Sequence, residues 1–89
     1  MTLEMKKFGV ILNSRPSASE AVLRVKQITN GSADGEIILD YNGVEVLTPS
    51  FADEFVNGIK KLYPDKKLKC SGYENNETIK DVLKKLGIV

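Results

Sequence analysis

Four side chains of this sequence have the chemistry to hold an anion or a nucleotide together: Arg15, Asp40, Ser50 and Asp53. Arg15 and Asp40 each follow a short apolar run. We therefore expect both near the carboxyl ends of strands, where open α/β sheets bind ligands. Ser50 and Asp53 belong to the start of a helix, whose free N–H groups attract anions. In the structural alternatives, Asp40 fixes a turn by accepting backbone N–H groups, and Arg15 pairs with Asp40 or Asp53.

Ser50 has two interpretations of its own. As a phosphoacceptor, it would gain from the helix dipole but meet repulsion from Asp53 and Glu54. As an N-cap, its hydroxyl would accept the N–H near Asp53, which is worth about 1 kcal/mol. Thr48, followed by Pro49 at the first helical position, is a competing cap. We expect Ser50 to be the cap, and we retain Arg15, Asp40, Thr48, Ser50, Asp53 and Glu54 as candidates for binding a partner or ligand.

Several features argue against catalysis. The sequence has no histidine, so the usual proton shuttle near neutral pH is missing. Asp53 and Glu54 are neighbours on a helix and point in different directions. Cys70, the single cysteine, excludes an internal disulfide and is expected to be inert on a strand. We expect no enzyme activity, no cofactor and no metal.

Composition and charge narrow the class of protein. The 89 residues fit one domain spanning 1–89, and the net charge of +1 argues against a nucleic-acid binder. We assign the lysines at 60, 61, 66, 67 and 69 to a solvated helix end and a protected strand edge. No apolar run approaches the roughly 20 residues of a membrane helix, and we expect a cytoplasmic protein. A homo-oligomer is left open.

Charge is distributed unevenly along the chain. No basic residue occurs between Lys26 and Lys60, a stretch that contains six acidic residues: Asp34, Glu36, Asp40, Glu45, Asp53 and Glu54. This pattern is either an incidental polarisation of a small domain or a negative patch that steers a basic partner.

Strand and helix patterns alternate along the chain. Strands are predicted over 8–12, 36–41 and 67–71, and helices after Arg15-Pro16, after Thr48 and after the Asn75-Asn76 pair. This rhythm predicts an α/β fold with a mostly parallel sheet of three to five strands packed with three helices. Three consecutive apolar residues, Ile37 to Leu39, suit a strand covered on both faces.

Two local patterns refine this scheme. Ser17 and Glu20 have capping-box spacing, and they introduce a helix expected to end at Asn30-Gly31. Its predicted apolar face is Ala18, Ala21, Val22, Val25 and Ile28. Asn42-Gly43 is also a strong hairpin signal, which would make 44–47 an antiparallel strand. The alternation of strands and helices favours the parallel arrangement, with the hairpin as the alternative.

The segment LDYNGVEVLTPSFADEF, preceded by NSRPSASEAV, resembles the STAS-like family, a set of small bacterial and phage-associated domains of unknown function. The resemblance covers nearly the whole chain and implies a sheet covered by helices that acts as a protein-interaction module. In the related anti-sigma-factor antagonists, a serine at the start of the helix after the central strand is phosphorylated. Their motif, Asp-Ser-Ser/Thr-Gly, aligns with Thr48, Pro49, Ser50 and Phe51, of which Ser50 alone matches.

The sequence therefore predicts a non-catalytic regulatory module that binds a protein partner through residues 40–55. The alternative is a domain that binds a small anion or nucleotide, or a weak enzyme, using Arg15, Asp40, Ser50 and Asp53.

Overall fold

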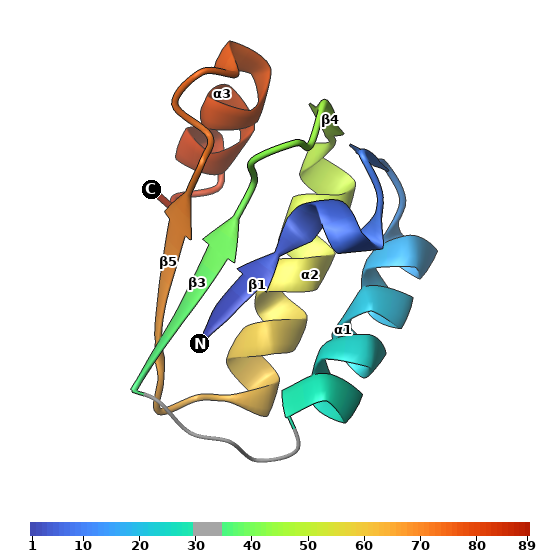
Figure 1. Ribbon diagram of the computed structural model, residues 1–89, viewed down its shortest axis with the longest axis vertical. Coiled ribbons are helices and arrows are strands. Elements are labelled where there is room, and N and C mark those ends of the chain that lie inside the picture. Colours follow the sequence, from blue (N-terminus) through green and yellow to red (C-terminus); the bar gives the residue numbers. More distant parts are fainter. Residues whose placement is uncertain (30–34) are drawn as a thin grey trace.

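The structure is a computed structural model that describes residues 1–29 and 35–89. Its elements, in chain order, are β1 (Thr2–Glu4), the 3₁₀ helix η1 (Met5–Phe8), β2 (Ile11–Leu12), α1 (Arg15–Thr29), β3 (Glu36–Asp40), β4 (Val46–Leu47), α2 (Pro49–Leu62), β5 (Lys67–Ser71) and α3 (Glu77–Lys85). The predicted α/β fold with three helices is confirmed (Figure 1).

The strands form two separate parallel sheets. The larger sheet has the order β1-β3-β5, and the smaller one pairs β2 with β4. In Figure 1, α2 lies behind the larger sheet and α1 runs beside α2. Ile37 and Leu39 of β3 are buried, whereas Ile38 between them is partly exposed. The predicted coverage of β3 on both faces was therefore wrong, because its partly exposed face carries Glu36, Ile38 and Asp40.

The first predicted strand, 8–12, is interrupted in the structure. Phe8 ends η1, and Gly9 follows with φ of 137°, a conformation that residues with side chains rarely adopt. The chain therefore leaves the larger sheet after β1, and Ile11 pairs in parallel with Val46. This pairing also excludes the hairpin, because residues 46–47 run beside β2 rather than back along β3.

The start of α1 also differs from its prediction. The helix begins at Arg15, and the Oγ of Ser14 accepts the N–H of Ser17 at 3.2 Å, so Ser14 takes the place expected of Ser17. Pro16 fits the first helical turn because N–H groups there have no helical partner. Ile28 is 65% exposed, contrary to its predicted place on the buried face. The predicted end at Asn30-Gly31 lies outside the described residues.

The core and the last helix follow the prediction more closely. The rings of Phe51 and Phe55 stack at 5.8 Å, and both side chains are buried. The spacing of Ile79, Val82, Leu83 and Leu86 predicts an apolar stripe on the last helix. The first three are buried in α3, whereas Leu86 lies at the C-cap and is 36% exposed. The side chain of Asn76 caps α3 by accepting the N–H of Ile79 at 3.1 Å.

The two long helices, α1 and α2, approach each other closely at Gly58. A Cβ at this position would lie 2.6 Å from Cγ2 of Val22 on α1. Gly58→Ala would gain about 1 kcal/mol of helix propensity. Overpacking against a stiff β-branched side chain costs about 1–3 kcal/mol. We therefore expect Gly58→Ala to lower the free energy of unfolding in urea titrations.

The control for this prediction is the double variant Gly58→Ala/Val22→Ala. Removing the Val22 methyl groups leaves room for the new Cβ, so the second substitution should cost less in the Gly58→Ala background than alone. Additive effects of the two substitutions would contradict the proposed clash.

Candidate functional site

The smaller sheet brings the starts of α1 and α2 together. The N–H of Glu45 donates to the carbonyl of Val10 at 2.8 Å, and the N–H of Thr48 donates to that of Leu12 at 2.9 Å. Since β2 leads into α1 and β4 into α2, these bonds fix the two helix starts side by side (Figure 1).

Arg15 links the two helix starts through carboxylates. Its Nη1 lies 3.2 Å from Asp53 Oδ2 and 3.3 Å from Glu54 Oε1. Ser19 donates to Glu54 Oε2 at 3.3 Å, and Asn57 donates to Asp53 Oδ1 at 3.2 Å. The predicted pairing of Arg15 with Asp53 is confirmed. Because the Arg15 side chain is 53% exposed, water screens these ion pairs, so they orient the helices more than they stabilise the fold.

Asp40 has a different role from Arg15 and Asp53. Its Oδ1 accepts the N–H of Asn42 at 3.0 Å, which fixes the turn after β3. The N–H of Val44 closes the same turn by donating to the carbonyl of Tyr41 at 3.0 Å. Asp40 therefore follows its structural interpretation, and among the described residues its side chain and that of Arg15 bond to different groups.

Thr48, not Ser50, caps α2. The Oγ1 of Thr48 accepts the N–H of Phe51 at 3.4 Å and donates to the carbonyl of Leu12 at 3.5 Å. Pro49 occupies the first helical position, where its fixed φ favours the helix. The expectation that Ser50 is the cap was wrong, because the helix begins before it. Ser50 is exposed in the first turn of α2.

This assignment can be tested by comparing two alanine variants. Thr48→Ala removes the acceptor for the Phe51 N–H and should lower the free energy of unfolding by about 1 kcal/mol. Ser50→Ala changes an exposed side chain and should stay within about 0.5 kcal/mol of the wild type. Chemical denaturation of both proteins measures the difference. A larger loss of unfolding free energy for Ser50→Ala than for Thr48→Ala would show that Ser50, not Thr48, caps α2.

Sequence patterns did not reveal an apolar group beside these helix starts. Ile11 and Val46, which are register partners, are 55% and 40% exposed, and the adjoining Val10 is 47% exposed. We call Val10, Ile11 and Val46 the apolar face. Leu12 and Leu47 point the other way, into the core. Both strands are apolar throughout, Ile-Leu at 11–12 and Val-Leu at 46–47, so no alternation in the sequence shows which residue of each pair is exposed.

The five described acidic residues of the central stretch do not share one patch. Glu36 lies at the start of β3, where its carboxylate bonds to Lys69 Nζ at 2.9 Å. Asp34 lies outside the described residues. Around the apolar face, residues 10–15 and 44–54 contribute Arg15 against Glu45, Asp53 and Glu54, a net charge of −2.

Two further titratable groups, Cys70 and Tyr41, have raised pKa values. Burial raises the pKa of the Cys70 thiol to about 11, so it stays protonated at neutral pH. Burial, with a smaller contribution from Cys70, also raises the pKa of Tyr41. Within residues 1–29 and 35–89, no three His, Cys, Asp or Glu side chains are grouped to hold a metal ion.

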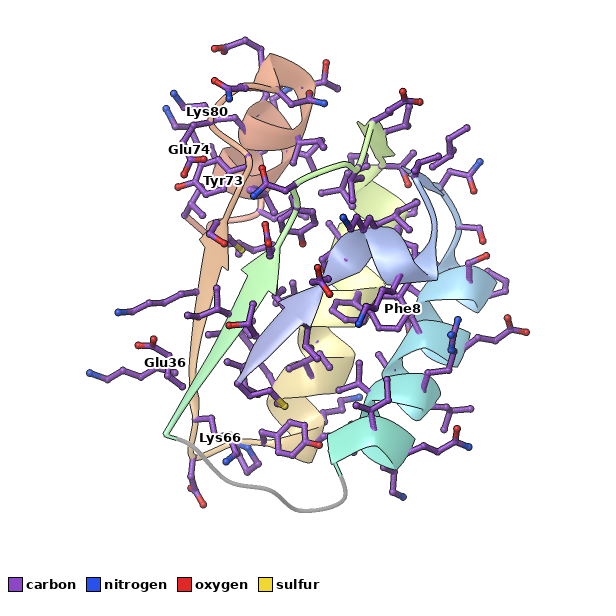
Figure 2. All side chains as sticks on the ribbon, viewed as in Figure 1. Phe8, Glu36, Lys66, Tyr73, Glu74 and Lys80 are labelled. Carbon is purple, nitrogen blue, oxygen red and sulfur yellow. The ribbon has the colours of Figure 1, made fainter. Side chains whose placement is uncertain are left out.

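A shallow groove of about 110 Å³ separates η1 from α1. It is lined by Phe8, Ser17, Glu20, Ala21 and Arg24. The guanidinium of Arg24 lies 5.5 Å from the centre of the Phe8 ring, which Figure 2 shows between η1 and α1. A basic and an acidic side chain line this groove together, so its charge does not select one sign of ligand.

Two of the lysines after α2, Lys66 and Lys69, contact other side chains. Lys69 pairs with Glu36, and the Lys66 ammonium lies 5.6 Å from the centre of the Tyr63 ring. Figure 2 shows Lys66 and Glu36 on the lower left of the molecule.

In the part of the chain that the structure describes, each helix is too short or too polar to span a bilayer.

One comparison with known proteins gives a match. A family model described as a STAS-like domain of unknown function matches residues 19–78, which is more than half of the chain. No curated protein and no solved structure matches the sequence.

Proposed function

The chain belongs to the STAS-like family of domains of unknown function, and on that premise we propose that it is a non-catalytic regulatory module that binds a protein partner. The docking surface comprises the apolar face and the adjoining starts of α1 and α2. It overlaps the sequence-predicted region of residues 40–55 and adds residues 10–15 to it.

The apolar face is the observation that carries this proposal. Isolated exposed apolar residues are ordinary, but adjacent ones rimmed by polar groups are typical of interaction sites. Ile11 and Val46 are adjacent register partners, and the N–H of Val46 also bonds to the carbonyl of Val10 at 3.1 Å. The exposed polar residues Asn13 and Ser50 follow these two strands within a few residues along the chain. Burial of the Val10, Ile11 and Val46 side chains against a partner would supply affinity, since apolar area removed from water is favourable by about 25 cal/mol per Å².

Charge supports a basic partner. The surface carries a net charge of −2 from residues 10–15 and 44–54. Exposed charges at the rim of an interface set the orientation and rate of association more than the affinity. We expect binding to weaken with salt mainly through a slower association rate.

Two side chains of the alternative site for an anion or nucleotide, those of Arg15 and Asp40, already bond to other groups of the chain. Arg15 contacts Asp53 and Glu54, and Asp40 bonds to Asn42. A pocket for a nucleotide needs these groups directed at one empty space. Their bonding within the chain favours a protein-binding surface over a site for a small anion.

Affinity capture with matched surface variants tests the proposal. Wild-type protein, Val46→Lys and Leu23→Lys are each immobilised and exposed to lysate from the native host, and bound proteins are quantified by mass spectrometry. Leu23 is 60% exposed on α1 and serves as the control for adding a lysine. We expect a partner retained by the wild type and Leu23→Lys but reduced at least ten-fold with Val46→Lys. Equal retention by all three proteins would contradict the proposed surface.

Regulation at Ser50 is tested in the same assay. A phosphate at this position would add negative charge to a surface that is already acidic and would strengthen docking of a basic partner. We expect Ser50→Asp to bind the partner more tightly than Ser50→Ala. If both variants capture the partner alike, a phosphorylation switch at Ser50 is excluded.

A further inference from the structure

Within residues 1–29 and 35–89, the backbone N–H and C=O of Ile11 in β2 have no hydrogen-bond partner. The carbonyls of Val10 and Leu12 point toward β4, where they accept the N–H groups of Val46 at 3.1 Å and Thr48 at 2.9 Å. Successive carbonyls of an extended strand point to opposite edges. The N–H and C=O of Ile11 therefore both point away from β4. Ile11 is also the most exposed member of the apolar face.

This edge lacks the charged side chains and prolines that protect many sheet edges. Natural proteins discourage pairing with charged side chains, particularly lysine, with proline or with very short strands. The edge strand β5 carries Lys67 and Lys69, and β1 carries Glu4. β2 is short, but both its exposed residue, Ile11, and the preceding Val10 are β-branched and uncharged. Such residues favour strand pairing.

From these observations we propose that the partner presents an extended segment, which joins the smaller sheet beside β2 and exchanges backbone hydrogen bonds with Ile11. The inference rests on the proposed function and specifies how docking occurs. An added strand gives affinity through main-chain bonds and specificity through alternate side chains. Alternate residues of the added strand then lie beside Ile11 on the exposed side of the sheet and extend the row of Ile11 and Val46.

The chemistry of the segment follows from its surroundings. Residues beside the apolar face must be apolar, and β-branched or aromatic types fit best in a strand. The net charge of −2 around the face favours at least one lysine or arginine in the segment. We therefore expect an apolar segment with alternating pattern and a basic residue.

The test uses a displayed library of random ten-residue peptides as the probe. Peptides selected on the wild-type protein are synthesised, and their dissociation constants are measured with wild type, Ile11→Pro and Ile11→Thr. Proline removes the outward N–H and is tolerated on an edge where that group faces solvent. Threonine keeps the N–H and the β-branch. Circular dichroism establishes that each variant is folded.

We expect selected peptides to bind at least ten-fold more weakly to Ile11→Pro and less than three-fold more weakly to Ile11→Thr. A second measurement uses the unmodified protein: saturating peptide should slow hydrogen exchange of the Ile11 N–H at least ten-fold. This measurement decides the question if Ile11→Pro does not fold.

Three results would overturn strand addition. Peptides that bind without protecting the Ile11 N–H would place docking on side chains alone and leave the proposed function intact. Protection of that N–H without peptide, with dimers in sedimentation equilibrium, would assign the edge to a second copy of the chain. If no peptide is selected, the edge does not accept strands, and the proposed function is then judged by capture with Val46→Lys.

Discussion

Replacing Phe55 with alanine is expected to lower the free energy of unfolding by about 3–5 kcal/mol. Phe55 is fully buried, and its ring lies 5.9 Å from that of Phe8 and 5.8 Å from that of Phe51. The substitution would remove the ring that links η1 to α2 and leave a cavity. Since small domains are stable by about 5–15 kcal/mol, a substantial unfolded population is expected.

Urea titration followed by circular dichroism measures this loss, and Leu23→Ala is the control. Leu23 is 60% exposed, so its truncation should change stability by less than about 0.5 kcal/mol. A loss below about 1 kcal/mol for Phe55→Ala would show that α2 does not pack its aromatic stripe into the core.

Gly72→Ala is expected to be the most damaging glycine-to-alanine change among the described residues. Gly72 has φ of 72°, and a Cβ there would overlap Asp40 Oδ1 and lie 2.7 Å from the backbone nitrogen of Asn42. The neighbours include backbone, which cannot turn aside as a flexible side chain can. We expect a loss of more than about 2 kcal/mol, from a backbone cost of about 1–2 kcal/mol plus the overlap.

Gly87→Ala separates the cost of the left-handed backbone conformation from the cost of steric overlap. Gly87 has φ of 71°, but a Cβ there would meet no atom within 4 Å, so this variant bears the backbone cost alone. Thermal and urea unfolding of both variants should place Gly72→Ala clearly below Gly87→Ala in stability. Equal losses would mean that the turn at Asp40 and Asn42 does not press against Gly72.

Long amphipathic segments made much of this fold predictable. α2 follows from Phe51, Phe55 and Ile59 at helical spacing, and α3 from Ile79, Val82 and Leu83. β5 has its predicted bounds, and β3 ends one residue early, at Asp40. The resemblance to the STAS-like family is confirmed by the match over residues 19–78.

The amino-terminal part was harder to predict because its elements are short. A strand of two residues, such as β2, carries no periodicity of its own. Met5 is fully buried in a 3₁₀ turn, and Gly9 redirects the chain through its backbone conformation. Neither the buried 3₁₀ turn nor the change of chain direction at Gly9 has a distinct pattern of apolar residues in the sequence. Sequence reasoning therefore merged the end of η1 with β2 and missed the smaller sheet.

Sequence reasoning identified the residues of the candidate site better than it identified the role of each residue. Pairing of Arg15 with Asp53 follows from helix starts that lie at the ends of neighbouring strands. The choice between Thr48 and Ser50 as cap depended on where the helix begins, and helix boundaries are poorly specified by sequence. The apolar face depends on pairing between residues 11 and 46, a long-range contact that local patterns do not encode.

Division of the strands into two sheets has a consequence for function. The smaller sheet buries Leu12 and Leu47 and presents Ile11 and Val46 to solvent. A sheet of this size gains little stability from exposed apolar side chains, because they stay in contact with water. The proposed binding of a partner would give these side chains a role that folding does not.

Hydrogen exchange on the complex tests the proposed docking surface most directly. The partner captured by the wild-type protein is purified with it, and exchange is compared between the free and bound chain by mass spectrometry. The proposed surface predicts slower exchange in residues 10–13 and 45–50, with little change in the described part of α1 beyond Leu23. Protection confined to β5 and α3, with residues 10–13 exchanging as in the free protein, would contradict it.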